Sequence, residues 1–326
     1  MREKILQLLK EQEDYVSGQD ICGQLGVSRT AVWKNIKALK EAGYQIDSVN
    51  NRGYKLLAEP DKLSETGIRG YKNTQWLGET IVYKDSMDSS NTRAKLMGEN
   101  GAENGTLVVT DCQTAGKGRR GRSWVSPTGM NCYFTVLLRP DILAEKASMI
   151  TLVAALALAK AIKETAQLDT MIKWPNDVIA NGKKLCGILT ESSTDLEYIN
   201  YVVVGIGVNC NQTEFPDEIK ETASSIRLET GKKVNRCQLL GSFLTNFESY
   251  YEIFLKTEDL SGLEREYNSL LVNRNREVKI IEKERERVLT AMGIDKTGAL
   301  LVKDAEGNQE AIISGEVSVR GLYGYV

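Results

Sequence analysis

The sequence predicts an α+β protein of several domains, and three observations support this fold class. Helical patterns with capping residues fill the N-terminal region, strand and helix patterns alternate through the middle, and short β segments with glycine turns fill the end. The chain has 326 residues, and a domain commonly holds about 100 to 200, so we expect two or three domains. We place them at 1–60, 61–275 and 276–326.

The N-terminal region shows three short helices and a hairpin. Ser17 and Ser28 stand where N-caps are expected, and Gly26 ends the second helix. Residues 44–57 then place apolar positions around an Asn-Asn-Arg-Gly tip, which predicts a β-hairpin. Three helices followed by a hairpin resemble a winged helix-turn-helix.

The third helix is basic on the face opposite its apolar stripe. A helix of this kind can enter the major groove of DNA while its cations neutralise phosphates. The residues that we expect to meet DNA are Ser28, Arg29, Thr30, Trp33, Lys34 and Lys37. A solvated basic face of a small helical domain, or a protein-docking module, is the alternative. We favour DNA because the helix spacing, the basic helix and the hairpin coincide.

The composition excludes several classes of protein. The 42 basic and 44 acidic residues nearly cancel, so a nucleic-acid partner must meet a local basic surface. The six cysteines form no Cys-x-x-Cys pair, which argues against a zinc site and a disulfide framework. No signal pattern and no long apolar run is present, so we expect a cytoplasmic protein without a membrane partner. The absence of histidine excludes a Ser-His-Asp triad and histidine metal sites.

The remainder of the chain is predicted in two parts. The middle part is an α/β or α+β domain that interleaves strands with a helix. We expect the strands at 81–83, 107–109, 132–138, 187–190 and 201–208, and the helix at 147–166. The last part is expected to form a small β-barrel-like domain from segments at 278–281, 291–294, 299–302, 311–313 and 317–319.

The segment Gly116–Arg122 combines three glycines with four cations. Glycine permits close backbone approach and positive φ, and converging cations neutralise an anion. The segment therefore suits a loop that wraps phosphates. Taken alone, a basic surface loop is an equally good interpretation.

Further polar motifs occur around this loop. Asp88-Ser89-Ser90-Asn91 supplies hydroxyls and an amide, although a helix cap is the simpler interpretation of that segment alone. Gln113-Thr114-Ala115 directly precedes the loop, and Lys173-Trp-Pro-Asn-Asp177 and Lys184 precede an apolar strand. Gly-Ile-Gly-Val-Asn209 lacks the third glycine and the following helix of a dinucleotide-binding fold.

In this order, the motifs resemble those of the bifunctional biotin ligase and biotin-operon repressor family. The resemblance covers the whole chain, from the winged N-terminus to Gly315-Glu-Val-Ser-Val-Arg320. It implies a catalytic domain similar to those of class II synthetases and a C-terminal SH3-like β domain.

The resemblance also implies a two-step reaction. Biotin and MgATP give biotinyl-5'-AMP and pyrophosphate, and a lysine of a biotin carboxyl carrier protein then takes the biotinyl group. A carboxylic acid with a pKa of about 4 to 5 is ionised at pH 7 and needs no histidine base. The family's second activity, biotin-responsive repression of biotin genes, implies operator DNA and a ligand-promoted homodimer as partners.

Residue roles follow from the matched motifs. The resemblance implies Arg119 and Lys184 as catalytic residues. The biotin-binding residues that it implies are Ser89, Ser90, Asn91, Gln113, Lys117, Gly118, Arg119 and Lys184, with Ile188 beside the alkyl chain. The ATP-binding residues are Trp124, Asn176, Asn209 and Arg320, and no metal-ligating residue is predicted. Asp177 is expected either to help deprotonate the incoming amine or to make a structural hydrogen bond.

Three positions depart from the family pattern. Lys117 stands where arginine is common, Ser90 where threonine is, and Cys186 lies within the lysine motif. Lysine keeps the positive charge of arginine but cannot form its bidentate hydrogen bonds, which predicts weaker binding of the intermediate.

Two alternative functions remain open from the sequence. A ligand-sensing repressor without ligase activity would not need the retained Arg119 and Lys184. A lipoate–protein ligase has a substrate with a similar alkyl chain, but the polar group of Asn91 and Gln113 favours biotin.

Overall fold

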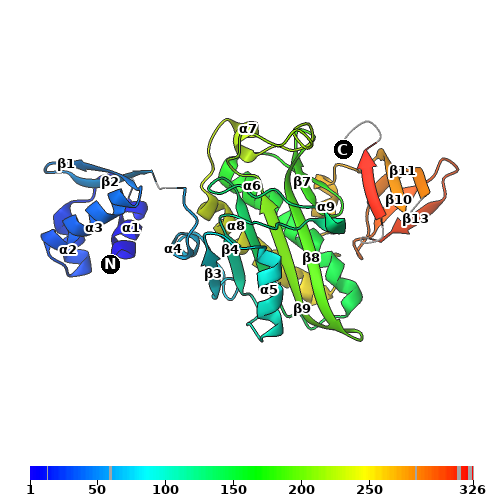
Figure 1. The fold of residues 1–326 in the computed structure, drawn as a ribbon, viewed down its shortest axis with the longest axis horizontal. Coiled ribbons are helices and arrows are strands. Elements are labelled where there is room, and N and C mark those ends of the chain that lie inside the picture. Colours follow the sequence, from blue (N-terminus) through cyan, green and yellow to red (C-terminus); the bar gives the residue numbers. More distant parts are fainter. Residues whose placement is uncertain (13, 59–60, 283–284, 314–316, 322–324, 326) are drawn as a thin grey trace. The chain divides into compact units, whose positions relative to one another are not determined.

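The computed structural model describes residues 1–12, 14–58, 61–282, 285–313, 317–321 and 325 (Figure 1). The chain divides into two compact units, Met1–Lys62 and Leu63–Val326. Glu59 and Pro60, at the predicted domain boundary after residue 60, lie outside the described residues. The further boundary after residue 275 stays a prediction.

The first unit has the predicted three helices and hairpin. Its elements are α1 (Arg2–Glu11), α2 (Gly18–Leu25), α3 (Arg29–Glu41), β1 (Gln45–Val49) and β2 (Gly53–Ala58). Ser17 and Ser28 cap α2 and α3 by accepting hydrogen bonds from Asp20 N and Ala31 N, and Gly26 ends α2 in the left-handed region. These capping predictions are confirmed. Each serine oxygen accepts a hydrogen bond from a backbone amide that has no partner within the first helical turn.

The hairpin is tied to the segment before α2. Val16 and Tyr54 exchange backbone hydrogen bonds of 2.9 Å in both directions. Gly53 has φ +110°, and a Cβ there would lie 2.0 Å from the carbonyl oxygen of Val16. Only glycine allows this approach, so Gly53 sets where the hairpin packs.

The second unit is built on a seven-stranded sheet. Its strands are β3 (Ile81–Lys84), β4 (Leu107–Thr110), β5 (Cys132–Leu138), β6 (Met171–Lys173), β7 (Asp177–Ala180), β8 (Lys183–Asp195) and β9 (Tyr198–Val208). The strand order is β3-β4-β5-β9-β8-β7-β6. The β3–β4 pair is parallel, and the other neighbours are antiparallel. The expected strands at 187–190 and 201–208 are parts of the longer β8 and β9.

Helices cover both faces of this sheet. The α-helices of this unit are α4 (Glu65–Arg69), α5 (Ser90–Glu99), α6 (Met149–Ala166), α7 (Ile226–Thr230), α8 (Arg236–Thr257) and α9 (Glu264–Leu270). Leu107 and Val109 join the core cluster that contains the apolar residues of α6 and α8, whereas Val108 packs with Ala94 of α5. Strands buried on both faces read as continuous apolar runs, which is why β4 and β5 were recognisable in the sequence.

The last strands form a five-stranded antiparallel sheet. They are β10 (Arg276–Glu282), β11 (Arg285–Ile294), β12 (Leu300–Lys303), β13 (Gln309–Ile312) and β14 (Val317–Gly321), in the order β13-β12-β11-β10-β14. Val278, Leu300 and Val302 belong to the same core cluster as the larger sheet. Trp174 Nε1 also donates a 3.0 Å hydrogen bond to Gly298 O. The all-β C-terminal part is therefore packed against the larger sheet.

Candidate active site

A small cavity of about 50 Å³ lies where α5 begins. Ser89 caps α5 by accepting a hydrogen bond from Thr92 N. Ser90 donates to Gln113 Oε1 through its backbone N at 2.9 Å and its Oγ at 3.2 Å. The Asp-Ser-Ser-Asn segment is therefore both a helix cap and a wall of the cavity. Its interpretation as a helix cap is thus compatible with its interpretation as a source of polar groups for a site.

Asn91 is fixed at the same end of the cavity. Its Oδ1 accepts from Thr135 Oγ1 at 2.7 Å, and its Nδ2 donates to Leu189 O at 3.1 Å and Glu191 Oε2 at 2.9 Å. Burial alone would raise the pKa of Glu191, but hydrogen bonds from Asn91 and Lys95 outweigh it and lower that pKa. Both N–H groups of Asn91 are engaged, so its Oδ1 has the remaining capacity for a ligand.

Glycines in the strands make the floor of this cavity. Gly205 and Gly207 alternate along β9 with Val204 and Ile206, whose side chains enter the core on the opposite face. A Cβ at Gly205 would lie 1.9 Å from Asn91 Oδ1. A Cβ at Gly207 would lie 2.5 Å from the indole of Trp124. The missing side chains let a polar group and an aromatic ring lie directly on the sheet.

A second cavity of about 860 Å³ adjoins the first. Gly118, Arg119, Trp124, Asn176 and Lys184 line both cavities. Within the described residues, Trp124 Nε1 is a buried donor without a hydrogen-bond partner. An unsatisfied donor at the junction can bind a ligand acceptor.

The glycine- and arginine-rich loop forms one wall of both cavities. Gly116 must be glycine, because a Cβ there would lie 2.5 Å from Trp124 O. Positive φ occurs at Gly121 but also at Arg120, with values of 72° and 56°. The expectation that glycines supply the positive φ values is thus only partly correct, since Gly118 has φ −118°.

Arg119 is anchored within this wall. Its guanidinium donates a 2.8 Å hydrogen bond to Asn176 Oδ1. Burial lowers the pKa of Arg119, and the charge of Asp177 opposes that shift. A partly desolvated guanidinium interacts strongly with an anionic ligand.

Lys184 is held between the two cavities. Its Nζ lies 2.6 Å from Asp177 Oδ1 and 5.3 Å from the centre of the Trp124 ring. The pair lies at the edges of β7 and β8, with about a quarter of the Lys184 side chain exposed. Cys186, two residues on, is fully buried, and burial raises the pKa of its thiol, which keeps it an apolar neighbour.

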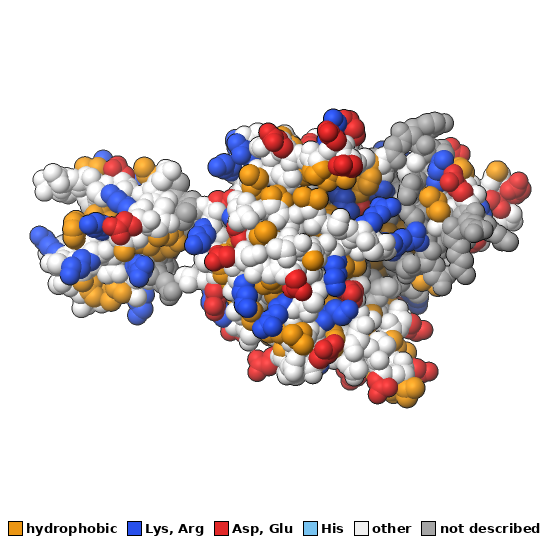
Figure 2. Space-filling model, in the orientation of Figure 1, with side chains coloured by type: hydrophobic (Ala, Val, Ile, Leu, Met, Phe, Trp, Pro, Cys, Tyr) orange, Lys and Arg blue, Asp and Glu red, His pale blue; other side chains and the backbone are white. Residues whose placement is uncertain are grey.

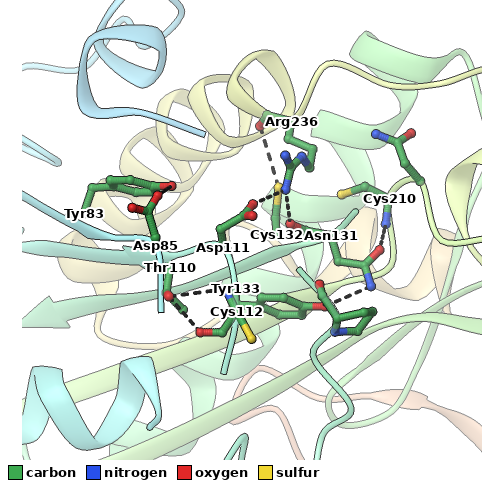
Figure 3. A network of polar contacts seen from close by, with 12 residues as sticks. Tyr83, Asp85, Thr110, Asp111, Cys112, Asn131, Cys132, Tyr133, Cys210 and Arg236 are labelled. Carbon is green, nitrogen blue, oxygen red and sulfur yellow. Dashed lines mark hydrogen bonds and ion pairs between the residues drawn. The ribbon is translucent and has the colours of Figure 1, made fainter. Parts of the chain in front are cut away.

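A largely buried polar network joins Asp111, Asn131, Cys210 and Arg236 (Figure 3). Arg236 Nη1 donates to Asp111 Oδ1 at 2.6 Å and to Asn131 O at 3.0 Å. Asn131 accepts from Cys210 N at 2.9 Å and donates to Gln212 Oε1 at 2.6 Å. Asp111 precedes Gln113 of the small cavity by two residues, and Gln212 lines the large one. The network therefore fixes strand ends that carry residues of both cavities.

The structure brings the predicted site residues together. The small cavity contains all the residues assigned to biotin, namely Ser89, Ser90, Asn91, Gln113, Lys117, Gly118, Arg119 and Lys184. Trp124, Asn176 and Asn209, assigned to ATP, line the large cavity. The side chain of Arg320 lies outside the described part of the chain. Ile188 lines the small cavity, but it also belongs to the main core cluster. The roles of these residues stay predictions.

Several residues of the site were missed in the sequence. They are Thr135, Glu191, Gln212, Arg236 and Tyr325. Thr135 is a single polar residue within the apolar run of β5, and Glu191 lies among the polar residues of the second half of β8, so neither residue stands out in the sequence. No local motif marks the other three.

The predicted DNA-contacting residues lie on one exposed helix. Ser28, Arg29, Thr30, Trp33, Lys34 and Lys37 are all exposed. Val32, Ile36 and Leu39 of the same helix are buried. The basic face of α3 thus points away from the hydrophobic core. Lys and Arg side chains are visible over this unit in Figure 2.

Two features are absent from the described residues. No helix there is both long and apolar enough to cross a membrane. No group of three or more metal-binding side chains was found among the same residues.

Known families match all three parts of the chain. Residues 83–209 match the biotin/lipoate A/B protein ligase family, residues 1–55 an HTH domain, and residues 275–320 the biotin protein ligase C terminal domain. The sequence thus joins a ligase catalytic domain to a helix-turn-helix unit.

Individual proteins agree with these matches. The bifunctional ligase/repressor BirA of Bacillus subtilis (strain 168) is 37% identical over 310 residues, which cover 94% of this chain and 95% of that protein. The BirA of Escherichia coli (strain K12) is 29% identical over 97% of this chain and 96% of its own. The biotin protein ligase from Aquifex aeolicus in complex with biotin and ATP superimposes with a TM-score of 0.66 at 31% identity, covering 74% of this chain and 99% of that one. This chain belongs to the bifunctional ligase/repressor family of biotin protein ligases.

Proposed function

We propose that this chain activates biotin with ATP, transfers it to a lysine of a biotin carboxyl carrier protein, and represses biotin genes. The observation that carries the ligase assignment is the junction of the two cavities, where Arg119, Trp124 and Lys184 line both. A carboxylate held in the small cavity and a nucleotide held in the large one would meet at these residues.

In the first step, a biotin carboxylate oxygen attacks the α-phosphorus of ATP. The new P–O bond forms as the bond to the β-phosphate oxygen breaks, and pyrophosphate leaves with that electron pair. Two anions must approach each other, so the chief need is charge neutralisation and alignment. The guanidinium of Arg119 and the ammonium of Lys184 would supply both.

In the second step, the amine of the acceptor lysine attacks the acyl carbon of biotinyl-5'-AMP. The C–N bond forms, the C–O bond to phosphate breaks, and AMP leaves. The amine must lose a proton, since its free pKa is about 10.4. Asp177 is the carboxylate at the junction, but its ion pair with Lys184 favours a role in holding that lysine.

We propose that Mg²⁺ enters with ATP. Glu218 lines the large cavity, and Mg²⁺ is commonly bound by substrate phosphates with one or two carboxylates and water. The donor set therefore fits a phosphate-borne ion, whose chemistry is neutralisation of phosphate charge.

The small cavity must open to admit biotin. Its volume of about 50 Å³ is far below the roughly 300 to 1,000 Å³ of ligand pockets. The Trp124 ring lies on the cavity floor, and the loop from Gly116 to Arg122 ends two residues before Trp124. We propose that this loop is the mobile lid over biotinyl-5'-AMP.

The ligase assignment is tested by isotope exchange. The purified chain should exchange labelled pyrophosphate into ATP only when biotin is present, and it should label a carrier protein in the second step. Lipoic acid is the control acid. Exchange supported equally by lipoic acid would favour a lipoate ligase, and DNA binding without any exchange would favour a ligand-sensing repressor.

The DNA-binding assignment predicts a salt-dependent loss in a charge variant. Lys34→Ala should weaken binding to operator DNA severalfold and reduce the slope of log affinity against log salt by about one, because one phosphate contact is lost. Lys10→Ala, which removes a lysine from α1, is the control. Equal effects of both variants would argue against α3 as the DNA-contacting helix.

We further propose that biotinyl-5'-AMP favours a homodimer that binds the operator. A ligand raises DNA affinity only if it binds the DNA-competent state more tightly. Sedimentation velocity and operator binding should therefore both respond to biotin plus ATP. Operator affinity unchanged by these ligands would contradict this coupling.

A further inference from the structure

Tyr325 enters the large cavity from the part of the chain that follows β14. It is among the residues that line this cavity. Its hydroxyl donates a hydrogen bond to Asp177 Oδ2, across 148 positions in the sequence. Its ring centre lies 3.5 Å from the ammonium nitrogen of Lys173. One aromatic side chain thus touches a carboxylate and a cation of the same site.

The phenol is suited to act as a lasting hydrogen-bond donor. Burial raises the pKa of Tyr325, and the charge and hydrogen bond of Asp177 raise it further. The hydroxyl therefore stays protonated around neutral pH, and it donates its proton to the hydrogen bond with the carboxylate.

Asp177 has two oxygens with different partners. Oδ1 is 2.6 Å from Lys184 Nζ and accepts a 3.2 Å hydrogen bond from Asn176 Nδ2. Oδ2 accepts the hydrogen bond from Tyr325. Because each oxygen has its own donor, the carboxylate cannot rotate without breaking a bond.

The strand register adds a competing cation. Lys173 and Asp177 are paired directly across β6 and β7, and residues in such pairs lie on one face and interact. Lys173 is 6% exposed, so its charge is poorly screened. The face of the Tyr325 ring stabilises this ammonium by a cation–π interaction. The Lys173 ammonium therefore competes less with Lys184 for the Asp177 carboxylate.

We propose that Tyr325 is a positioning residue for the ligation reaction: it holds the Asp177 carboxylate so that one oxygen remains directed at Lys184. The Lys184 ammonium is then directed at the point where the biotin carboxylate meets the α-phosphate. Without the phenol, Asp177 turns, and Lys184 follows it away from the reacting atoms. This inference rests on the proposed ligase function.

The first test removes only the hydroxyl. Tyr325→Phe keeps the ring over Lys173, so packing is preserved. In biotin-dependent pyrophosphate exchange we expect kcat to fall about tenfold, with KM for biotin and for ATP within about twofold, because alignment and not ground-state binding is lost. Tyr15→Phe is the matched control: Tyr15 donates a 2.6 Å hydrogen bond to Asp47 in the other unit, and its loss should leave exchange unchanged.

The second test is a double-mutant cycle with Asp177→Asn. If Tyr325 acts through this carboxylate, adding Tyr325→Phe to Asp177→Asn should cause no further loss of kcat. Tyr325→Leu, which also removes the ring, should lower kcat at least as much as Tyr325→Phe. Thermal melting of each variant separates loss of fold from loss of alignment.

Several outcomes would overturn the inference. These are a wild-type kcat in Tyr325→Phe, a full tenfold loss in the Asp177→Asn background, or a raised KM for ATP with unchanged kcat, which would make Tyr325 a nucleotide contact. A wild-type chain without any exchange would instead contradict the proposed function itself. An active wild type with an unaffected Tyr325→Phe variant contradicts this inference alone.

Discussion

Replacing Lys184 by alanine is expected to lower the rate of biotin-dependent pyrophosphate exchange by about a hundredfold or more, the loss typical when one pre-positioned charge-stabilising donor is removed. The ammonium stands 2.6 Å from Asp177 Oδ1 at the junction of the two cavities. Without it, the two anionic reactants would meet with one compensating charge fewer. Single-turnover formation of biotinyl-5'-AMP measures the effect on the chemical step.

The adjacent Lys183→Ala variant is the matched control for this experiment. Lys183 is the neighbouring lysine of β8, so its side chain points to the opposite face of the strand. It does not line either cavity among the described residues. A comparable loss in Lys183→Ala, or a near-normal rate in Lys184→Ala, would contradict the assignment of Lys184.

Replacing Asp111 by alanine is expected to destabilise the second unit by about 3 to 5 kcal/mol, because it leaves the buried guanidinium of Arg236 without its carboxylate. The side chain of Arg236 is only 2% exposed, and its ion pair with Asp111 is 2.6 Å long. The midpoint of urea unfolding, followed by tryptophan fluorescence, measures the change.

Two further variants separate this effect from the general loss of an ion pair. Asp169→Ala removes the partner of Lys163, an exposed pair 2.7 Å apart, and should cost less than about 1 kcal/mol. Asp111→Ala combined with Arg236→Met should recover part of the lost stability, since no charge is then buried alone. Equal costs for Asp111→Ala and Asp169→Ala would show that the network of Figure 3 is not stabilising.

Local sequence signals predicted several elements of the fold, but not the long helix α8 (Arg236–Thr257). Ser17, Ser28 and Gly26 marked helix ends, because each satisfies the backbone groups of a single turn and needs no distant partner. The buried strands β4 and β5 were visible as apolar runs, since both faces of the sheet are covered. The three-residue β6 was missed, because so short a segment has no measurable period.

The sequence by itself determined which chemical groups this protein has: a basic capped helix, a glycine- and arginine-rich loop, and ordered amides and lysines. Only the tertiary structure decided which of them meet. Arg236 donates a hydrogen bond to Asp111, which is 125 positions away in the sequence, and Tyr325 donates one to Asp177, which is 148 positions away. Such pairs depend on the strand order and on the packing of the C-terminal sheet, which no local pattern contains. Strand order is set by how all the apolar faces are buried at once, so these positioning contacts became visible only in the folded chain.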